Sequence, residues 1–110
     1  MLLRLKEELE MVKLIGTAEY QKEVMQSEGT VLVDFFADWC GPCKMQAPIV
    51  EALSEERKDV KFLKLNVDDS VEIAMELNIT SIPTIMVVKN GEITYKQPGL
   101  MTKPQLEALL

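Results

Sequence analysis

Histidine is absent from this sequence, and cysteine occurs only twice among its 110 residues, as Cys40 and Cys43. Without an imidazole the chain cannot perform Ser–His–Asp or Cys–His catalysis, and it cannot hold zinc through histidine. A small secreted disulfide scaffold would carry roughly four to eight cysteines. The two thiols therefore favour an intracellular protein or a redox pair over a disulfide framework.

Basic residues are also few, because 12 Lys and Arg stand against 18 Asp and Glu, which gives a net charge of −6. Nucleic-acid binding needs a positive surface that this balance does not suggest. No stretch approaches the ~18 apolar residues of a membrane span. The first ten residues, MLLRLKEELE, carry charges where a signal peptide needs an apolar run. We therefore expect a soluble, cytoplasmic protein whose partners are neither nucleic acid nor membrane.

Apolar residues make up 47% of the chain, which is enough for one compact domain to fold unaided. We expect residues 11–110 to form this single domain and residues 1–10 to be an N-terminal extension. Leu2, Leu5 and Leu9 have helical spacing in the extension. The pattern is too short for a coiled coil, which needs about three or four heptads. We therefore expect a monomer.

Predicted strands and helices alternate along the domain. Residues 30–37, TVLVDFFA, are apolar on both faces apart from one aspartate, which is typical of a central strand covered by helices. Asn90-Gly91 is the strongest hairpin signal and predicts an antiparallel pair of strands, 82–88 and 92–96. Further strands are predicted at 11–15 and 60–67, and helices after Thr17, after Cys43, from Ser70 to Leu77 and after Thr102. The order predicts an α/β fold, a three-layer sandwich with a central mixed sheet of about five strands and about four helices.

Several side chains predict where the helices begin. Thr17 and Ser70 are typical N-cap residues. Thr102 and Gln105 have the spacing of a capping box before the last helix.

Other residues predict which faces are buried. Met45, Ile49 and Leu53 have the four-residue spacing of one helix face, and Pro48 should kink that helix. Ile93 and Tyr95 should share one face of the last strand.

The motif Cys40-Gly41-Pro42-Cys43 lies where the predicted central strand gives way to a helix. As a structural cross-link, a disulfide across four residues would add only about 1.9 kcal/mol to the free energy of unfolding, against about 4.7 kcal/mol for a 100-residue loop. As a redox switch it is well placed, because two thiols one helical turn apart can open and close without moving the fold.

Unpaired N–H groups and the macrodipole at a helix N-terminus favour a thiolate, which is the reactive form of cysteine. We therefore expect Cys40, at the first exposed position, to be the attacking sulfur, and Cys43, more buried, to act second. Pro42 is tolerated in a first helical turn, and Gly41 should admit backbone geometry that a larger residue would resist.

A metal site is the alternative use of a CxxC motif. Zinc needs four ligands, and the sequence has neither a second CxxC nor a histidine. An iron–sulfur cluster shared by two chains stays formally open. We expect no metal.

Asp34 is a carboxyl group within the predicted central strand, where it should be buried beside Leu32 and Phe36. Lys64 in the strand 60–67 is its candidate partner, and an ion-paired or a water-bridged aspartate are the structural alternatives. A buried carboxyl with a raised pKa could instead take the proton of Cys43. Pro83 should mark the start of a strand. Trp39 and Met45 are more typical of packing residues than of contacts to a ligand.

The segment VLVDFFADWCGPCK, followed by Ala47-Pro48, KLNVDD, SIPT, NGE and a late PGL, resembles the thioredoxin family. The match runs in order from about Met11 to Leu110. It implies a thioredoxin fold and a general protein-disulfide reductase. Phe36 departs from the family, because many thioredoxins have a second tryptophan there.

The resemblance also implies roles for single residues. Cys40 would be the nucleophile, Cys43 the resolving thiol, and Asp34 with Lys64 the buried pair that assists proton transfer.

A docking surface for the substrate follows from the same resemblance. Pro83 matches the family's cis-proline, and the backbone of Ile82 would pair with an extended substrate segment. The apolar docking surface would be completed by Trp39, Gly41, Pro42 and Gly99.

The implied partners are disulfide-containing proteins and a thioredoxin reductase, linked to NADPH or to ferredoxin, with no cofactor bound apart from the redox-active Cys40–Cys43 disulfide. Three other functions stay open on the sequence alone. They are a disulfide oxidase or isomerase of the same fold, a binding subunit that does not use its thiols, and a structural chain with an inert disulfide.

Overall fold

A computed structural model of the chain describes residues 11–110. The predicted N-terminal extension, residues 1–10, lies outside the described residues. The strands are β1 (Val12–Ile15), β2 (Thr30–Phe36), β3 (Val60–Asn66), β4 (Thr84–Lys89) and β5 (Glu92–Pro98). The α-helices are α2 (Thr17–Tyr20), which a π-helical segment over Gln21–Met25 extends, α3 (Gly41–Glu56), α4 (Val71–Glu76) and α5 (Lys103–Glu107).

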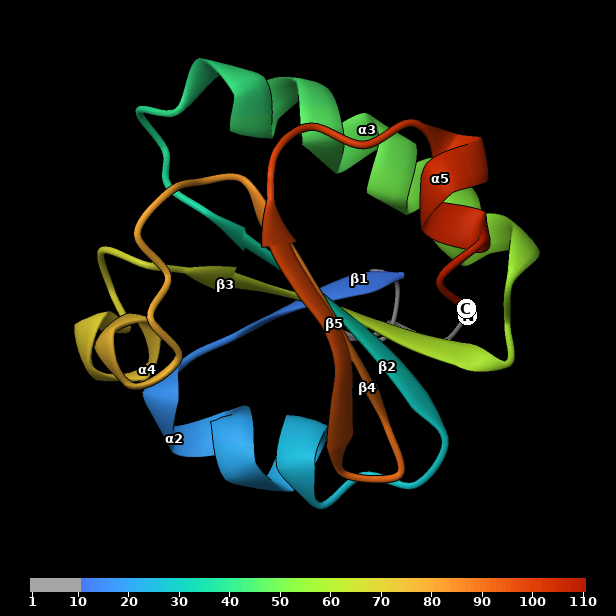
Figure 1. Cartoon of the computed structure of the whole chain (residues 1–110), viewed down its shortest axis with the longest axis horizontal. Coiled ribbons are helices and arrows are strands. Elements are labelled where there is room, and N and C mark those ends of the chain that lie inside the picture. Colours follow the sequence, from blue (N-terminus) through green and yellow to red (C-terminus); the bar gives the residue numbers. More distant parts are fainter. Residues whose placement is uncertain (1–10) are drawn as a thin grey trace, which may run out of the picture.

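The five strands form one mixed sheet in the order β1-β3-β2-β4-β5. Strands β1 and β2 are parallel to β3, whereas β4 is antiparallel to β2 and to β5. Figure 1 shows α3 and α5 on one side of this sheet and α2 on the other. The predicted three-layer α/β fold is confirmed, and β2 lies at the centre of the sheet as expected.

Two apolar cores fill the space between the sheet and its helices. Val31, Val33 and Phe35 of β2 pack toward α2 and α4 in one core. Leu32 belongs to the other core, under α3 and α5. Because successive residues of a strand point to opposite faces, Asp34 lies on the same face as Leu32, beneath α3.

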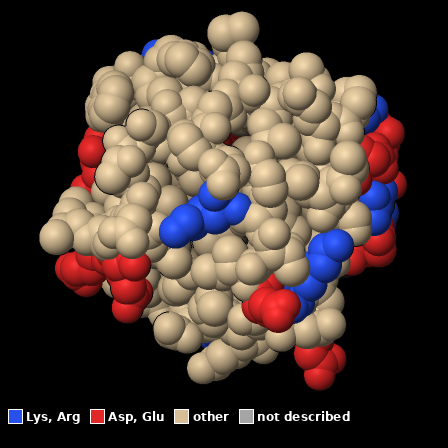
Figure 2. All heavy atoms as spheres, viewed as in Figure 1, with Lys and Arg blue, Asp and Glu red and all other residues tan. Residues whose placement is uncertain are grey.

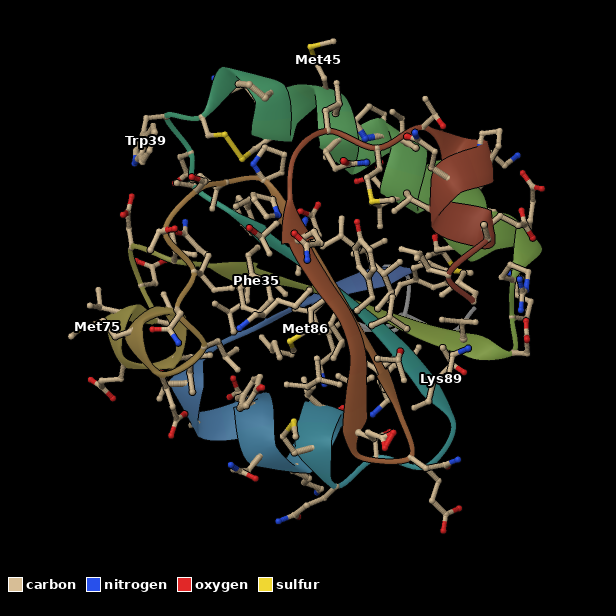
Figure 3. All side chains as sticks on the ribbon, viewed as in Figure 1. Phe35, Trp39, Met45, Met75, Met86 and Lys89 are labelled. Atoms are coloured by element: carbon tan, nitrogen blue, oxygen red, sulfur yellow. A yellow bond between two sulfur atoms is a disulfide. The ribbon has the colours of Figure 1, made fainter. Side chains whose placement is uncertain are left out.

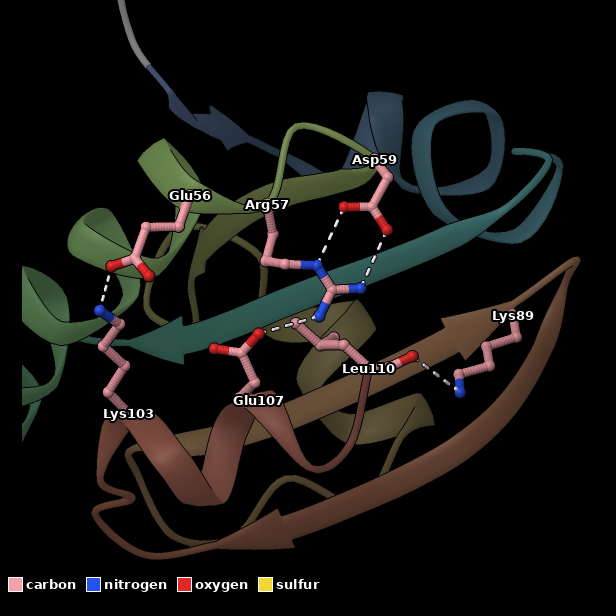
Figure 4. A network of polar contacts seen from close by, with 7 residues as sticks. All are labelled: Glu56, Arg57, Asp59, Lys89, Lys103, Glu107 and Leu110. Carbon is pink, nitrogen blue, oxygen red and sulfur yellow. Dashed lines mark hydrogen bonds and ion pairs between the residues drawn. The ribbon is translucent and has the colours of Figure 1, made fainter.

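Helix α5 is held against α3 mainly by burial of Leu106, which is 0% exposed. Figure 4 shows the polar contacts that surround this packing. Arg57, at the end of α3, donates to Glu107 on α5 at 3.2 Å, and Lys103 pairs with Glu56. Exposed ion pairs contribute little to stability, so these contacts align α5 more than they stabilise it.

The N-cap residues predicted from the sequence agree only in part with those of the structure. Thr102 and Gln105 form the predicted capping box, with Gln105 N–H donating to Thr102 Oγ1 at 3.3 Å. Thr17 was the wrong residue for the first cap, because Gly16 occupies that position and donates its N–H to Glu19 Oε1 at 2.6 Å. Ser70 does precede α4, but its buried hydroxyl has no hydrogen-bond partner within residues 11–110.

The buried face of α3 differs from the predicted one. It carries Cys43, Gln46, Val50 and Leu53, whereas Met45 is 60% exposed. The four-residue spacing therefore identified the helix but placed Met45 on the wrong face. The helix runs without a break through Pro48, which is exposed.

The hairpin of β4 and β5 contains an irregularity that the sequence did not indicate. Val87 pairs with Tyr95 and Val88 with Ile93, which leaves Thr94 as an extra residue in β5. Paired residues share a face of the sheet, and Val87 and Val88 point to opposite faces. Ile93 and Tyr95 therefore lie on opposite faces, contrary to the prediction.

The hairpin turn itself is as predicted. Asn90 and Gly91 have φ values of 50° and 81°, the left-handed conformation that a two-residue turn requires. Gly29 also has a positive φ, of 80°, and its N–H donates to Asn90 Oδ1 at 2.8 Å.

We expect Gly91→Ala to lower the free energy of unfolding more than Gly29→Ala does. Each alanine loses roughly 1–2 kcal/mol to the left-handed backbone. At Gly91 a Cβ would also lie 2.8 Å from the carbonyl oxygen of Met25, whereas at Gly29 it would meet nothing within 4 Å. This overpacking should add about 1–3 kcal/mol to the loss at Gly91. Urea unfolding of both variants measures the difference, and equal losses would contradict the described packing.

Candidate active site

A disulfide joins Cys40 and Cys43 at the beginning of α3, with their Cα atoms 5.2 Å apart (Figure 3). Cys40 is the N-cap residue of the helix, and Cys43 lies in its first turn. Both residues are buried, at 4% and 3% exposure. In this oxidised form the exposed fractions of the two cysteines are almost equal, so exposure does not test the expectation that Cys43 is the more buried thiol.

Hydrogen bonding distinguishes the two sulfur atoms where exposure does not. The N–H of Cys43 donates to Cys40 Sγ at 3.2 Å. This donor belongs to the first turn of a 16-residue helix, whose N-terminus carries a partial positive charge. No hydrogen bond among residues 11–110 reaches Cys43 Sγ in the same way. A negative charge that develops on sulfur is therefore stabilised at Cys40.

The opposite wall of the site is the segment before β4. The bond between Ile82 and Pro83 is cis, as the resemblance implied, and the Ile82 carbonyl oxygen lies 3.8 Å from Cys40 Sγ. Because Pro83 has no N–H, β4 begins at Thr84, two residues later than predicted. The N–H of Gly99 donates to the Pro83 carbonyl at 2.9 Å, which joins the end of β5 to this wall.

The residues that flank the disulfide in sequence are exposed, whereas on the opposite wall Ile82 is half-buried and Pro83 is buried. Trp39 is 70% exposed, and its indole N–H donates to Asp68 Oδ2 at 2.8 Å. Figure 3 shows Trp39 and Met45 projecting from the molecule, so the interpretation of both as packing residues was wrong. Gly41 and Pro42 are exposed as well.

Gly41 does not need the conformational freedom that the sequence suggested. It begins α3, its φ is not positive, and a Cβ there would contact nothing within 4 Å. What a side chain at Gly41 would change is the exposed surface beside the disulfide.

Charged residues are sparse on the face that Figure 2 shows. Uncharged residues cover most of this face, and acidic side chains gather toward its rim.

Asp34 is 3% exposed and lies directly opposite Lys64 in the pairing of β2 with β3. The expected alignment is therefore present, but no Asp34–Lys64 ion pair within 4.0 Å occurs among the described residues, and Asp34 Oδ1 has no hydrogen-bond partner there. Burial raises the pKa of Asp34 to about 7, and the positive charge of Lys64 opposes this rise.

One cavity of about 190 Å³ connects the carboxyl group with the second thiol. Its lining includes Asp34, Lys64, Cys43 and Ala47. The cavity is large enough for several water molecules, each of which needs about 30 Å³. The cavity therefore has room for water between Cys43 and Asp34, as both a water-bridged aspartate and a proton-transfer role would require.

Two contributors to the site were missed by the sequence reasoning. Asp68 fixes the indole of Trp39, and Gln46 binds the backbone of Met101. Gln46 follows Cys43 by three residues, a spacing that places both on one helix face, and this was the available signal. Asp68 gave no signal, because it is one of several acidic residues in an exposed turn.

Two further searches concern residues 11–110 alone. No three Cys, Asp or Glu side chains of this region converge in a way that could hold a metal ion. None of its helices has the length and apolarity that crossing a membrane requires.

Comparison with known proteins gives one consistent result. The family model Thioredoxin matches residues 11–110. A thioredoxin of Rickettsia felis is 47% identical over 97 residues, which cover 87% of this chain and 92% of the relative. A thioredoxin of Porphyra purpurea is 43% identical over 100 residues, covering 90% and 94%. A thioredoxin of Mycoplasma genitalium is 41% identical over 96 residues, covering 87% and 94%.

The raised pKa of Asp34 predicts how stability depends on pH. The carboxyl ionises near its ordinary pKa of 3.8 in the unfolded chain and at about 7 in the folded protein. Between these values the folded protein keeps a proton that the unfolded chain has lost, so stability decreases as pH rises from about 4 to about 7. Asp34→Asn removes this decrease.

Urea unfolding of the oxidised proteins tests this point. We subtract the unfolding free energy of the wild type from that of Asp34→Asn at each pH. We expect this difference to be up to about 4 kcal/mol larger at pH 8 than at pH 3.5. A stability difference between the two proteins that is the same at both pH values would contradict the described burial of Asp34.

Proposed function

The chain belongs to the thioredoxin family, and on this premise we propose how its individual residues act. Its chemistry is thiol–disulfide exchange, and its activity is the reduction of protein disulfides. The observation that carries the assignment of roles is the hydrogen bond from the Cys43 N–H to Cys40 Sγ.

Cys40 is the nucleophile. Its thiolate attacks one sulfur of a substrate disulfide, so that the substrate S–S bond breaks and a mixed disulfide with Cys40 forms. The second substrate sulfur leaves as a thiolate. The helix N-terminus supports this role, because its N–H donor stabilises the negative charge at Cys40 before the attack.

Cys43 is the resolving thiol. After losing its proton it attacks Cys40 Sγ, the mixed disulfide breaks, and the substrate leaves with both of its sulfurs reduced. Asp34 accepts the proton of Cys43, and the shared cavity supports this transfer. A carboxyl group whose pKa lies at about 7 can accept and release a proton near neutral pH. Lys64, the cross-strand neighbour of Asp34, favours the ionised carboxylate and so limits the rise of its pKa.

The substrate docks against the residues that surround the disulfide. An extended substrate segment pairs with the backbone of Ile82, whose N–H has no hydrogen-bond partner among the described residues and whose neighbour Pro83 begins the wall opposite Cys40. The apolar docking surface consists of Trp39, Gly41, Pro42, Ile82, Pro83 and Gly99.

Each turnover leaves the Cys40–Cys43 disulfide, so an external reductant must restore the two thiols. A thioredoxin reductase, linked to NADPH or to ferredoxin, performs this step, and the chain itself binds no cofactor. We place the reaction in the cytoplasm, carried out by a monomer whose redox domain is residues 11–110. The three relatives reported above are each named thioredoxin, which does not favour a disulfide oxidase or isomerase.

The assigned roles predict which cysteine variant captures substrates. With Cys43→Ser, attack by Cys40 still occurs but resolution cannot, so mixed disulfides on Cys40 should accumulate in a cell lysate. With Cys40→Ser the nucleophile is lost, and reduction of insulin disulfides should fall to the background rate. Nonreducing electrophoresis and mass spectrometry measure the captured species, and an insulin-precipitation assay measures the rate of reduction.

The matched pair of variants makes the outcome unambiguous. If Cys40→Ser captures as many proteins as Cys43→Ser, the two roles are reversed or shared. If neither variant captures any protein while the wild type reduces insulin, a mixed disulfide on Cys40 is not an intermediate.

A further inference from the structure

Gln46 is a fully buried polar side chain on the helix that carries both thiols. It lies on α3 at 0% exposure, one turn after Cys43. The next residues on the same helix face, Val50 and Leu53, are apolar and also buried. An apolar residue could fill the same space, so hydrogen bonding is what distinguishes Gln46 from its neighbours.

The Gln46 carboxamide makes two hydrogen bonds to one residue, Met101. Its Nε2 donates to the Met101 carbonyl at 3.1 Å, and its Oε1 accepts the Met101 N–H at 2.8 Å. Met101 lies between β5 and α5, where neither a strand nor a helix supplies partners for its backbone. Two bonds to one residue fix both the distance and the orientation of this segment relative to α3.

The anchored segment continues directly into the wall of the active site. Two residues before Met101, the Gly99 N–H donates to the Pro83 carbonyl, and the adjacent Ile82 carbonyl lies 3.8 Å from Cys40 Sγ. Gln46 therefore links the helix that carries Cys43, through Met101 and Gly99, to the wall that faces Cys40. Leu100, between the two anchored residues, is 44% exposed and faces outward.

We propose that Gln46 is a positioning residue for docking of protein disulfides, because it holds the segment 98–101 at a fixed distance from the helix that carries Cys40 and Cys43. The inference rests on the proposed function, in which Gly99 belongs to the docking surface. A protein substrate must place its chain against this segment, whereas a small disulfide can reach Cys40 without it. Gln46 thus acts on the recognition of large substrates and leaves the chemistry at sulfur unchanged.

The test compares two disulfides of different size. Gln46→Met has the same side-chain length and lacks both hydrogen bonds. The reduced protein is mixed with insulin or with 5,5′-dithiobis(2-nitrobenzoic acid), and the second-order rate is followed by the emission of Trp39, the only tryptophan of the chain. We expect the rate with insulin to fall about fivefold to tenfold, which corresponds to the loss of about one hydrogen bond. The rate with the small disulfide and the reduction potential should stay at their wild-type values.

A second variant and a control keep the result interpretable. Gln46→Asn keeps the amide but is one methylene shorter, so it should show the same selective loss without placing an apolar group beside the Met101 backbone. Lys103→Met removes a different contact of α3, the pair of Glu56 with Lys103 of α5, and leaves the Gln46 clamp intact. It should change neither rate.

The outcomes separate the inference from the proposed function. Equal losses with both disulfides, or an unchanged insulin rate in both Gln46 variants, would overturn the positioning role. Failure of the wild type itself to reduce insulin would overturn the proposed function, and the inference with it.

Discussion

The hydrogen bond from the Cys43 N–H to Cys40 Sγ fixes one sulfur at the positive end of α3, and the remainder of the site is arranged around that contact. It depends on a strand and a helix meeting within a few residues, because β2 ends at Phe36 and α3 begins at Gly41. Strand β2 is central in the sheet and has an apolar core on each face. The junction is therefore held by a strand that is buried on both faces, and the disulfide can open and close on a fixed frame.

Proton transfer depends on the same strand. A chain without histidine needs another group that titrates near neutral pH, and Asp34, buried six residues before Cys40, has this property because its surroundings disfavour the charged form. The burial that suits Asp34 for accepting a proton also destabilises the fold when the carboxyl ionises. Keeping such a residue at the centre of the sheet is the usual compromise between stability and activity at functional sites.

Features that depend on local patterns could be predicted from the sequence. Strand β2, the Asn90-Gly91 turn and the Thr102 capping box are each determined by a few neighbouring residues. The alignment of Asp34 with Lys64 could also be predicted, because both residues lie at inward positions of predicted strands.

Features that depend on contacts between distant segments could not be predicted in this way. The clamp of Gln46 on Met101 joins residues 55 positions apart, and nothing near Gln46 indicates its partner. The extra residue Thr94 in β5 reverses the alternation that Ile93 and Tyr95 would otherwise follow. The exposure of Trp39 was missed because large aromatic residues are usually packed, whereas here the indole bonds to Asp68 at the surface.

The central claim, that the start of α3 makes Cys40 the reactive sulfur, is tested most directly by alkylation of the reduced protein with iodoacetamide. The rate is measured as a function of pH, the modified residue is identified by mass spectrometry, and free cysteine is titrated alongside. The account predicts that Cys40 is modified first and that its titration midpoint lies below that of free cysteine. A midpoint at or above that of free cysteine, or prior modification of Cys43, would contradict it.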